Sequence, residues 1–125
     1  MRQFRRLLAS PTCRILVVRG AGGTLVAEIV GLLRHFSIPS GRIYKVAVHP
    51  SAQGQGLGRR LIAAMEAEFR RAGMVAAVAE VRVSNTGSRA LFEACGYQAG
   101  ERLPRYYADG EDGVKYRKVL ASRPS

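Results

Sequence analysis

The segment Gln53-Gly54-Gln55-Gly56-Leu57-Gly58-Arg59 decides the fold of this chain more than any other stretch. It separates a β-rich run at residues 41–48 from a run in which Leu61, Met65 and Phe69 recur at helical spacing. Glycine lets the backbone bend, and a helix start offers unpaired N–H groups at the positive end of its dipole. The segment therefore predicts a strand, a loop and a helix that together bind phosphate.

Two well-known phosphate-binding motifs do not fit this segment. A dinucleotide fingerprint requires a third glycine where Arg59 stands, and the P-loop pattern of glycine, lysine and serine or threonine is absent. A phosphate cradle of another type remains, and a plain glycine-rich turn is its alternative.

Outward from this segment, the pattern predicts alternating strands and helices. Strands are expected at 15–19, 24–36 and 41–48, and again at 75–83, 97–106 and 114–120. A second helix should run from an Asn85 cap to Cys95, with Ala90, Leu91 and Ala94 facing inward. Residues 1–12 read as a helix remnant, because Phe4, Leu7 and Leu8 have helical spacing. The order predicts an α/β (α+β) fold with a mixed, largely antiparallel sheet and helices on both faces.

Composition favours one compact domain that spans residues 1–125. The 20 Lys and Arg residues outnumber the nine Asp and Glu, which gives a net charge of +11. Such a charge attracts nucleic acid, the ribosome or a phosphorylated cofactor, or it reflects only an arginine-rich proteome. No apolar run suits a membrane helix, and the two cysteines are too few for a disulfide framework. We expect reduced thiols, a cytoplasmic protein and no metal site.

Three motifs together resemble the GCN5-related N-acetyltransferases. The segment at 53–59 matches the signature R/Q-x-x-G-x-G/A, Glu80-Val81-Arg82-Val83-Ser84-Asn85 follows it, and Ala90-Leu91-Phe92-Glu93-Ala94-Cys95-Gly96-Tyr97 comes next. The run from Arg105 to Asp112 is similar to the branch that acetylates protein N-termini, which includes the ribosomal-protein-alanine acetyltransferases.

The resemblance implies a sheet whose central parallel strands splay apart, with acetyl-CoA as the acetyl donor. Residues 43–73 would form the acetyl-CoA-binding strand, loop and helix, and residues 97–120 the closing β-hairpin. We expect no counterpart of the family's N-terminal strand and first helix ahead of Cys13. A homodimer could cover the sheet edge thus left open.

The resemblance also assigns the site residues. Glu80 would be the catalytic base, and Tyr106 and Tyr107 would bind the acceptor. The implied cofactor-binding residues are Val46, Ala47, Val48, Gln53, Gly54, Gln55, Gly56, Leu57, Gly58, Arg59, Asn85 and Phe92. For Glu80 the alternative is a structural ion pair, for Asn85 a helix cap, and for Phe92 simple core packing.

One residue departs from the family pattern. Where bacterial relatives have a tyrosine that protonates the leaving thiolate, this chain has Phe92. Water could supply the proton instead, or Tyr97, Tyr106 or Tyr107 could, or the chain could bind acetyl-CoA and transfer poorly.

The predicted activity is acetyl transfer to a primary amine, most simply the α-amine of a peptide or protein such as a ribosomal protein. A small amine or a lysine is the first alternative, and a non-catalytic module bound to acetyl-CoA, the ribosome or nucleic acid is the second. The acidic residues at 109–112 are expected to attract a cationic amine, or else to form a solvated turn.

Overall fold

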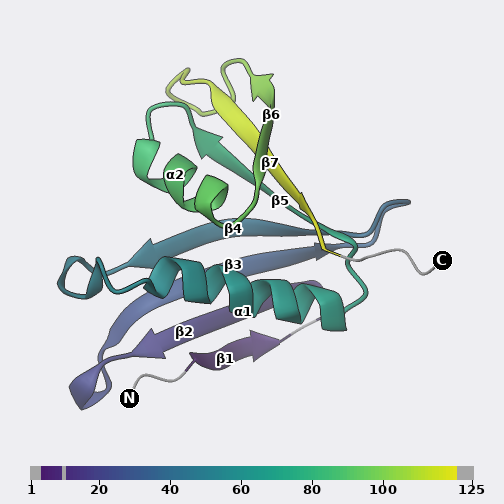
Figure 1. Ribbon diagram of the computed structural model, residues 1–125. Helices are drawn as coiled ribbons and strands as arrows, with labels where there is room; N and C mark the ends of the chain where they lie inside the picture. The colour runs from purple at the N-terminus through teal and green to yellow at the C-terminus, as the bar shows by residue number, and fades with distance from the viewer. Residues whose placement is uncertain (1–3, 10, 121–125) are drawn as a thin grey trace.

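The computed structural model describes residues 4–9 and 11–120. Seven strands form one sheet in the order β1-β2-β3-β4-β5-β7-β6, in which only β4 and β5 are parallel neighbours (Figure 1). The elements in chain order are β1 (Phe4–Ala9), β2 (Cys13–Arg19), η1 (Ala21–Gly23), β3 (Leu25–Arg34), β4 (Ser40–Val48), η2 (Pro50–Ala52), α1 (Leu57–Arg71), β5 (Ala76–Arg82), α2 (Thr86–Ala94), β6 (Gln98–Leu103) and β7 (Gly113–Val119).

The mixed, largely antiparallel sheet predicted from the sequence is confirmed. The helix remnant predicted at residues 1–12 is wrong where the structure describes it, because Phe4–Ala9 is a strand paired with β2. Residues 1–3 and 10 lie outside the described residues. The expected lack of an N-terminal strand is therefore also wrong, although β1 leads to β2 with no helix in the described residues between them. A short apolar run fits the periodicity of a helix as well as that of a strand. The open edge of β2 offers backbone hydrogen-bond partners, and these favour the strand.

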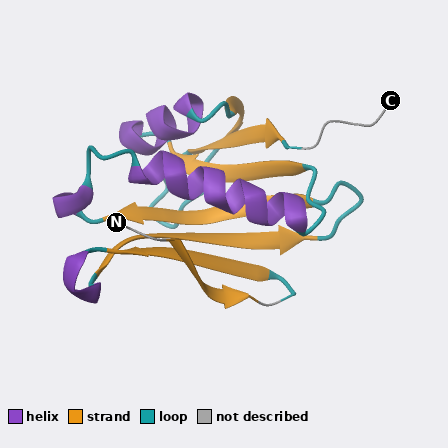
Figure 2. Ribbon diagram, turned by 60° about the horizontal axis from the view of Figure 1, so that its bottom comes forward, coloured by secondary structure: helices purple, strands orange, loops and turns teal. Residues whose placement is uncertain are grey.

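Both helices pack on the same face of the sheet, so the expected helices on both faces are not found among the described residues (Figure 2). Phe69 of α1 lies over Gly41 of β4, and Phe92 of α2 stacks on Tyr116 of β7. Pairing places Gly41 and Tyr116 opposite alternate residues of β5, whose side chains point the same way.

A pair of glycines receives the Phe69 ring of α1. A Cβ at Gly31 would lie 2.6 Å from the Met65 sulfur and 2.9 Å from the Phe69 ring, and a Cβ at Gly41 would overlap that ring. Because no side chain fits at either position, the C-terminal half of α1 is held directly on the backbones of β3 and β4.

Phe92 is the buried residue of α2, whereas Ala90 and Ala94, which were expected to face inward, are exposed. Among the helices in the described residues, none has both the length and the apolar composition needed to cross a membrane.

Candidate active site

The central strands β4 and β5 diverge after three paired positions. Parallel pairing stops at Arg42 and Val78, so the predicted splay is present. The register between β3 and β4 shifts between Val30 and Gly31, which leaves Tyr44 as an extra residue in β4. A bulge of this kind bends a strand and increases its twist. It therefore turns β4 away from β5 close to the point where their pairing ends.

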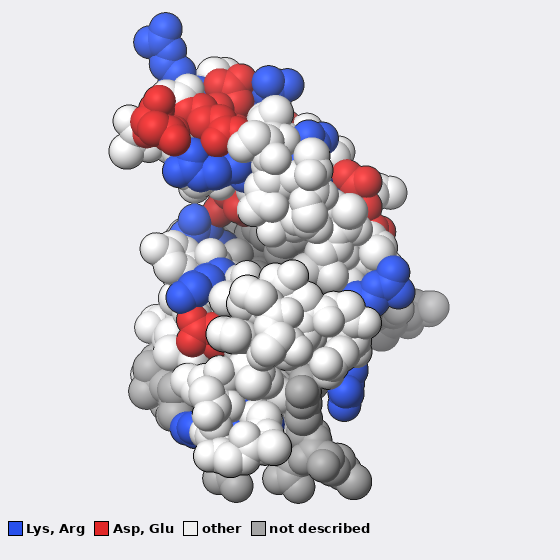
Figure 3. Space-filling model, turned by 90° about the vertical axis from the view of Figure 1, so that its left-hand side faces the viewer, with Lys and Arg blue, Asp and Glu red and all other residues white. Residues whose placement is uncertain are grey.

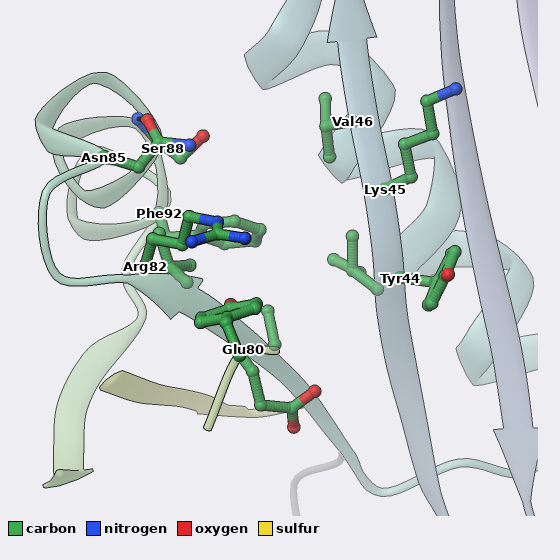
Figure 4. Close-up of a pocket in the computed structure, with 12 residues that line it drawn as sticks. Tyr44, Lys45, Val46, Glu80, Arg82, Asn85, Ser88 and Phe92 are labelled. Carbon is green, nitrogen blue, oxygen red and sulfur yellow. Dashed lines mark hydrogen bonds between the residues drawn. The ribbon is translucent and has the colours of Figure 1, made fainter. Parts of the chain in front are cut away.

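The divergence opens a cavity of about 210 Å³, called the gap below (Figure 4). Its walls come from both strands, from α2 and from the loop that follows β6. The lining residues include Ile43, Tyr44, Lys45, Val46, Ala79, Glu80, Val81, Arg82, Asn85, Ser88, Phe92 and Tyr107.

A second cavity, called the glycine hollow, lies at the start of α1. Gly54 and Gly56 have φ of +79° and +74°, and a Cβ built on either would meet nothing within 4 Å. Gly56 is the N-cap residue, and no side chain caps the helix. The first N–H groups of α1 are thus open to an anion. The hollow is lined by Val48, Ala52, Gln53, Gly54, Gly56, Leu57, Gly58, Arg59, Asn85, Gly87, Ser88 and Leu91.

Asn85 and Ser88 line both cavities, so the glycine hollow continues into the gap. Asn85 Oδ1 accepts a hydrogen bond from Ser88 N (3.1 Å), which makes Asn85 the N-cap of α2. Its amide nitrogen has no partner among the described residues and can still donate to a ligand. The cap and the predicted cofactor contact are therefore compatible.

Some of the other predicted cofactor residues line one of the two cavities, and others lie outside both. Val46 lines the gap and Val48 the glycine hollow, while Ala47 lines a shallow hollow beside β3. Gln53 Nε2 donates to the carbonyl of Val48 (3.2 Å), and Gln55 is exposed and lines neither cavity.

Three more of these residues serve packing as well as the cavity. Leu57 is buried in the core. Gly58 gives α2 room, because a Cβ there would lie 3.1 Å from Leu91. Phe92 is 4% exposed and contacts the rings of Tyr97 and Tyr116, so core packing is part of its role even though it lines the gap.

Glu80 is held by an arginine from the opposite strand. Arg42 Nε donates to Glu80 Oε1 (2.5 Å), and the Arg42 guanidinium also lies over the ring of Tyr44 and 3.5 Å from the hydroxyl of Tyr106. Burial opposes the charge of Arg42, but the hydrogen bond and the charge of Glu80 outweigh it and raise the pKa of Arg42. Glu80 thus lies in the gap as an ion-paired carboxylate. Sequence reasoning missed Arg42 and Tyr44, because only the register of β4 against β5 brings them to Glu80.

The acidic residues at 109–112 are already paired with arginines. Asp109 and Glu111 accept from the same Arg82 nitrogen at 2.8 and 2.9 Å, and Asp112 accepts from Arg102. Hydrogen bonds from the backbone and from these arginines lower the pKa of all three carboxyls. Figure 3 shows the acidic side chains gathered beside basic ones at this end of the molecule. The carboxylates expected to attract a cationic amine are thus paired with arginines and hold the closing loop together, and their attraction of an amine stays a prediction.

The tyrosines weighed as proton donors differ in position. Tyr97 is buried and donates to Glu66 (2.8 Å); burial and the charge of Glu66 raise the pKa of Tyr97 strongly. Tyr106 is 45% exposed at the rim, and Tyr107 lines the gap. Burial, followed by the neighbouring Tyr106, raises the pKa of Tyr107. Within the described residues, no group of His, Cys, Asp and Glu side chains is arranged to hold a metal ion.

Comparison with known proteins identifies the family. The chain matches the profile of the Acetyltransferase (GNAT) family over residues 1–97. It is 36% identical over 118 residues to the N-alpha-acetyltransferase RimI of Mycobacterium tuberculosis, covering 92% of this chain and 72% of that protein. It is 36% identical over 75 residues to the [ribosomal protein bS18]-alanine N-acetyltransferase of Escherichia coli K12, covering 58% of this chain and 51% of that enzyme.

The fold is also that of a solved acetyltransferase. A chain in the crystal structure of the NatC complex bound to Gag peptide and CoA superposes with a TM-score of 0.78 at 23% identity, covering 87% of this chain and 71% of that chain. The chain therefore belongs to the GNAT family and is an N-acetyltransferase that uses acetyl-CoA.

Proposed function

We propose that the chain transfers the acetyl group of acetyl-CoA to the α-amine at the N-terminus of a protein or peptide. The observation that carries this proposal is the continuity of the two cavities through Asn85 and Ser88, which joins the start of α1 to Glu80. The similarity to the mycobacterial and Escherichia coli enzymes, whose names specify N-terminal acetylation, supports the acceptor class.

The donor would lie along both cavities. Its pyrophosphate would accept from the backbone N–H groups after Gly56, with Arg59 beside it as a permanent cation. Its pantetheine arm would pass between β4 and α2, where the amide nitrogen of Asn85 can donate and the backbone of residues 46–48 can pair. The thioester would then lie near Phe92 and Glu80.

The reaction needs a neutral amine and a base. An α-amine has a pKa of about 7.7–8.0, against about 10.4 for lysine, so much of it is already neutral near pH 8. The amine nitrogen forms a bond to the acetyl carbon while the carbon–sulfur bond breaks and the electron pair leaves on sulfur. The amine proton passes to Glu80 through water and is returned through water to the thiolate, so it ends on sulfur; water carries it because Phe92 has no hydroxyl.

The acceptor would approach from the side of Tyr106 and Tyr107, which border the gap opposite the donor. A ribosomal protein as acceptor, a cytoplasmic location and a homodimer remain predictions.

Two peptides of the same length, matched in sequence except at the residue that carries the lysine, test the proposal. One has a free N-terminus and no lysine, and the other has a blocked α-amine and one lysine. Thiol release from acetyl-CoA should be faster with the first peptide. Faster transfer to the blocked lysine peptide would exclude the α-amine as the preferred acceptor, and binding of acetyl-CoA without transfer to either would favour a non-catalytic module.

A further inference from the structure

The guanidinium of Arg82 is fixed on two sides in the gap. Its Nη1 donates to Asp109 and to Glu111, and its plane lies 4.2 Å from the ring centre of Tyr107. Glu111 also accepts from Ser84 N (2.9 Å), which ties the loop to the residues that follow β5. Arg82 is thus held in one orientation without any ligand.

Two donor groups of this guanidinium remain available. The bonds to the carboxylates use Nη1 alone, and neither Nε nor Nη2 of Arg82 has a partner among the described residues. Arg82, Phe92 and Glu80 all line the gap, and Figure 4 shows the guanidinium above Glu80 in that view; we place the amine and the thioester in the same part of the gap. A fixed donor in this part of the gap suits an acceptor oxygen of the bound substrate.

The charge of the cluster indicates a neutral oxygen. Asp109 and Glu111 already outweigh the single positive charge of Arg82, so a third carboxylate would be repelled while a carbonyl dipole would not. In an N-terminal residue, a carbonyl follows directly after the carbon that bears the amine. In a lysine side chain, the nearest carbonyl lies far from the amine.

We propose that Arg82 binds the first carbonyl oxygen of the acceptor and thereby selects N-terminal α-amines over amines that lack this carbonyl. The inference rests on the proposed function. It makes Arg82 a specificity-determining residue, a role that the family motifs quoted from the sequence do not assign to it. The carboxylates of the closing loop then serve to aim this donor.

A double-mutant cycle between protein and peptide tests the contact. The peptide is prepared with its normal first carbonyl and with that oxygen replaced by sulfur, which keeps the shape but accepts hydrogen bonds poorly. The wild-type chain should prefer the oxygen peptide by about tenfold in kcat/KM, the size of one charge-assisted hydrogen bond. In Arg82→Met the ratio should fall to near one.

The cycle separates the contact from damage to the loop, since a loosened loop slows both peptides alike. Arg102→Met is the matched control, because Arg102 pairs with Asp112 in the same loop but does not line the gap; its ratio should equal that of the wild type. A ratio that is the same in the wild type and in Arg82→Met overturns the inference and leaves the α-amine as acceptor. Transfer to neither peptide refutes the proposed function, and the inference with it.

Discussion

Gly56 is the position at which the phosphate cradle can be tested most cleanly. Its φ of +74° belongs to the left-handed region, and a Cβ there would meet nothing within 4 Å. A side chain at this position therefore costs about 1 kcal/mol of backbone strain and makes no clash with the protein. The change Gly56→Asp adds a negative charge at the N-terminus of α1, where we place the pyrophosphate of acetyl-CoA.

The expected loss of affinity follows from Coulomb's law. For a carboxylate about 5 Å from one phosphate charge, the repulsion is about 1 kcal/mol at the dielectric constant of water and about 3 kcal/mol at an effective value near 20. The Kd for acetyl-CoA should therefore rise by between about fivefold and a few hundredfold. The rise should shrink with added salt, because exposed charges are screened.

Gly73→Asp is the matched control. Gly73 follows the other end of α1, has φ of +84° and likewise has nothing within 4 Å of a Cβ. Gly73→Asp should lose at least as much thermal stability as Gly56→Asp, roughly 3–5 °C in Tm, because its carboxylate lies at the negative end of the helix dipole, but only Gly56→Asp should bind acetyl-CoA more weakly in calorimetry. If the Kd of Gly56→Asp equals that of the wild type, the glycine hollow does not hold the pyrophosphate.

Three further predictions concern the gap and its closing loop. Glu80→Gln should lower kcat by roughly 10²-fold or more and leave the Kd for acetyl-CoA unchanged, as expected for a base; equal turnover across pH 6–9 would make Glu80 structural. Phe92→Tyr should raise kcat in a thiol-release assay if protonation of the thiolate limits the rate, and an unchanged kcat would show that water suffices. The carboxyls of Asp109, Glu111 and Asp112 have pKa values lowered by folding, so their contribution to stability is present at neutral pH and is lost as the pH falls below about 4 through those lowered values. Because the chain has no tryptophan, the tyrosine signal in near-ultraviolet circular dichroism should follow this loss, and a signal constant down to pH 2.5 would contradict it.

The elements with local signals could be predicted from the sequence. Helix α1 begins after Gly56 and is followed by Gly73, and both glycines have the positive φ that their positions require. The cap at Asn85 and the left-handed Gly96 likewise bound α2. Such signals act within a few residues, which is why the order of the elements from β2 onward could be derived.

Features set by strand register could not be predicted in the same way. Glu80 was predicted as the base, but its partner Arg42 lies on another strand, and the bulge at Tyr44 has no glycine or proline to mark it. The pairing of the acidic loop with arginines was missed for the same reason, since Arg82 is far from it in the sequence. Whether a charge is free or paired depends on tertiary neighbours, and a single sequence does not list them.

Helix α1 connects the core to the proposed cofactor site. The Phe69 ring holds its C-terminal half on Gly31 and Gly41, and its first residue, Leu57, borders the glycine hollow. Twelve residues at 1.5 Å each put these points about 18 Å apart, so a shift at the ring that tilts the helix also moves the amides that we propose bind phosphate. We therefore expect Gly41→Ala to weaken the binding of acetyl-CoA, although this variant keeps every residue that we propose binds it.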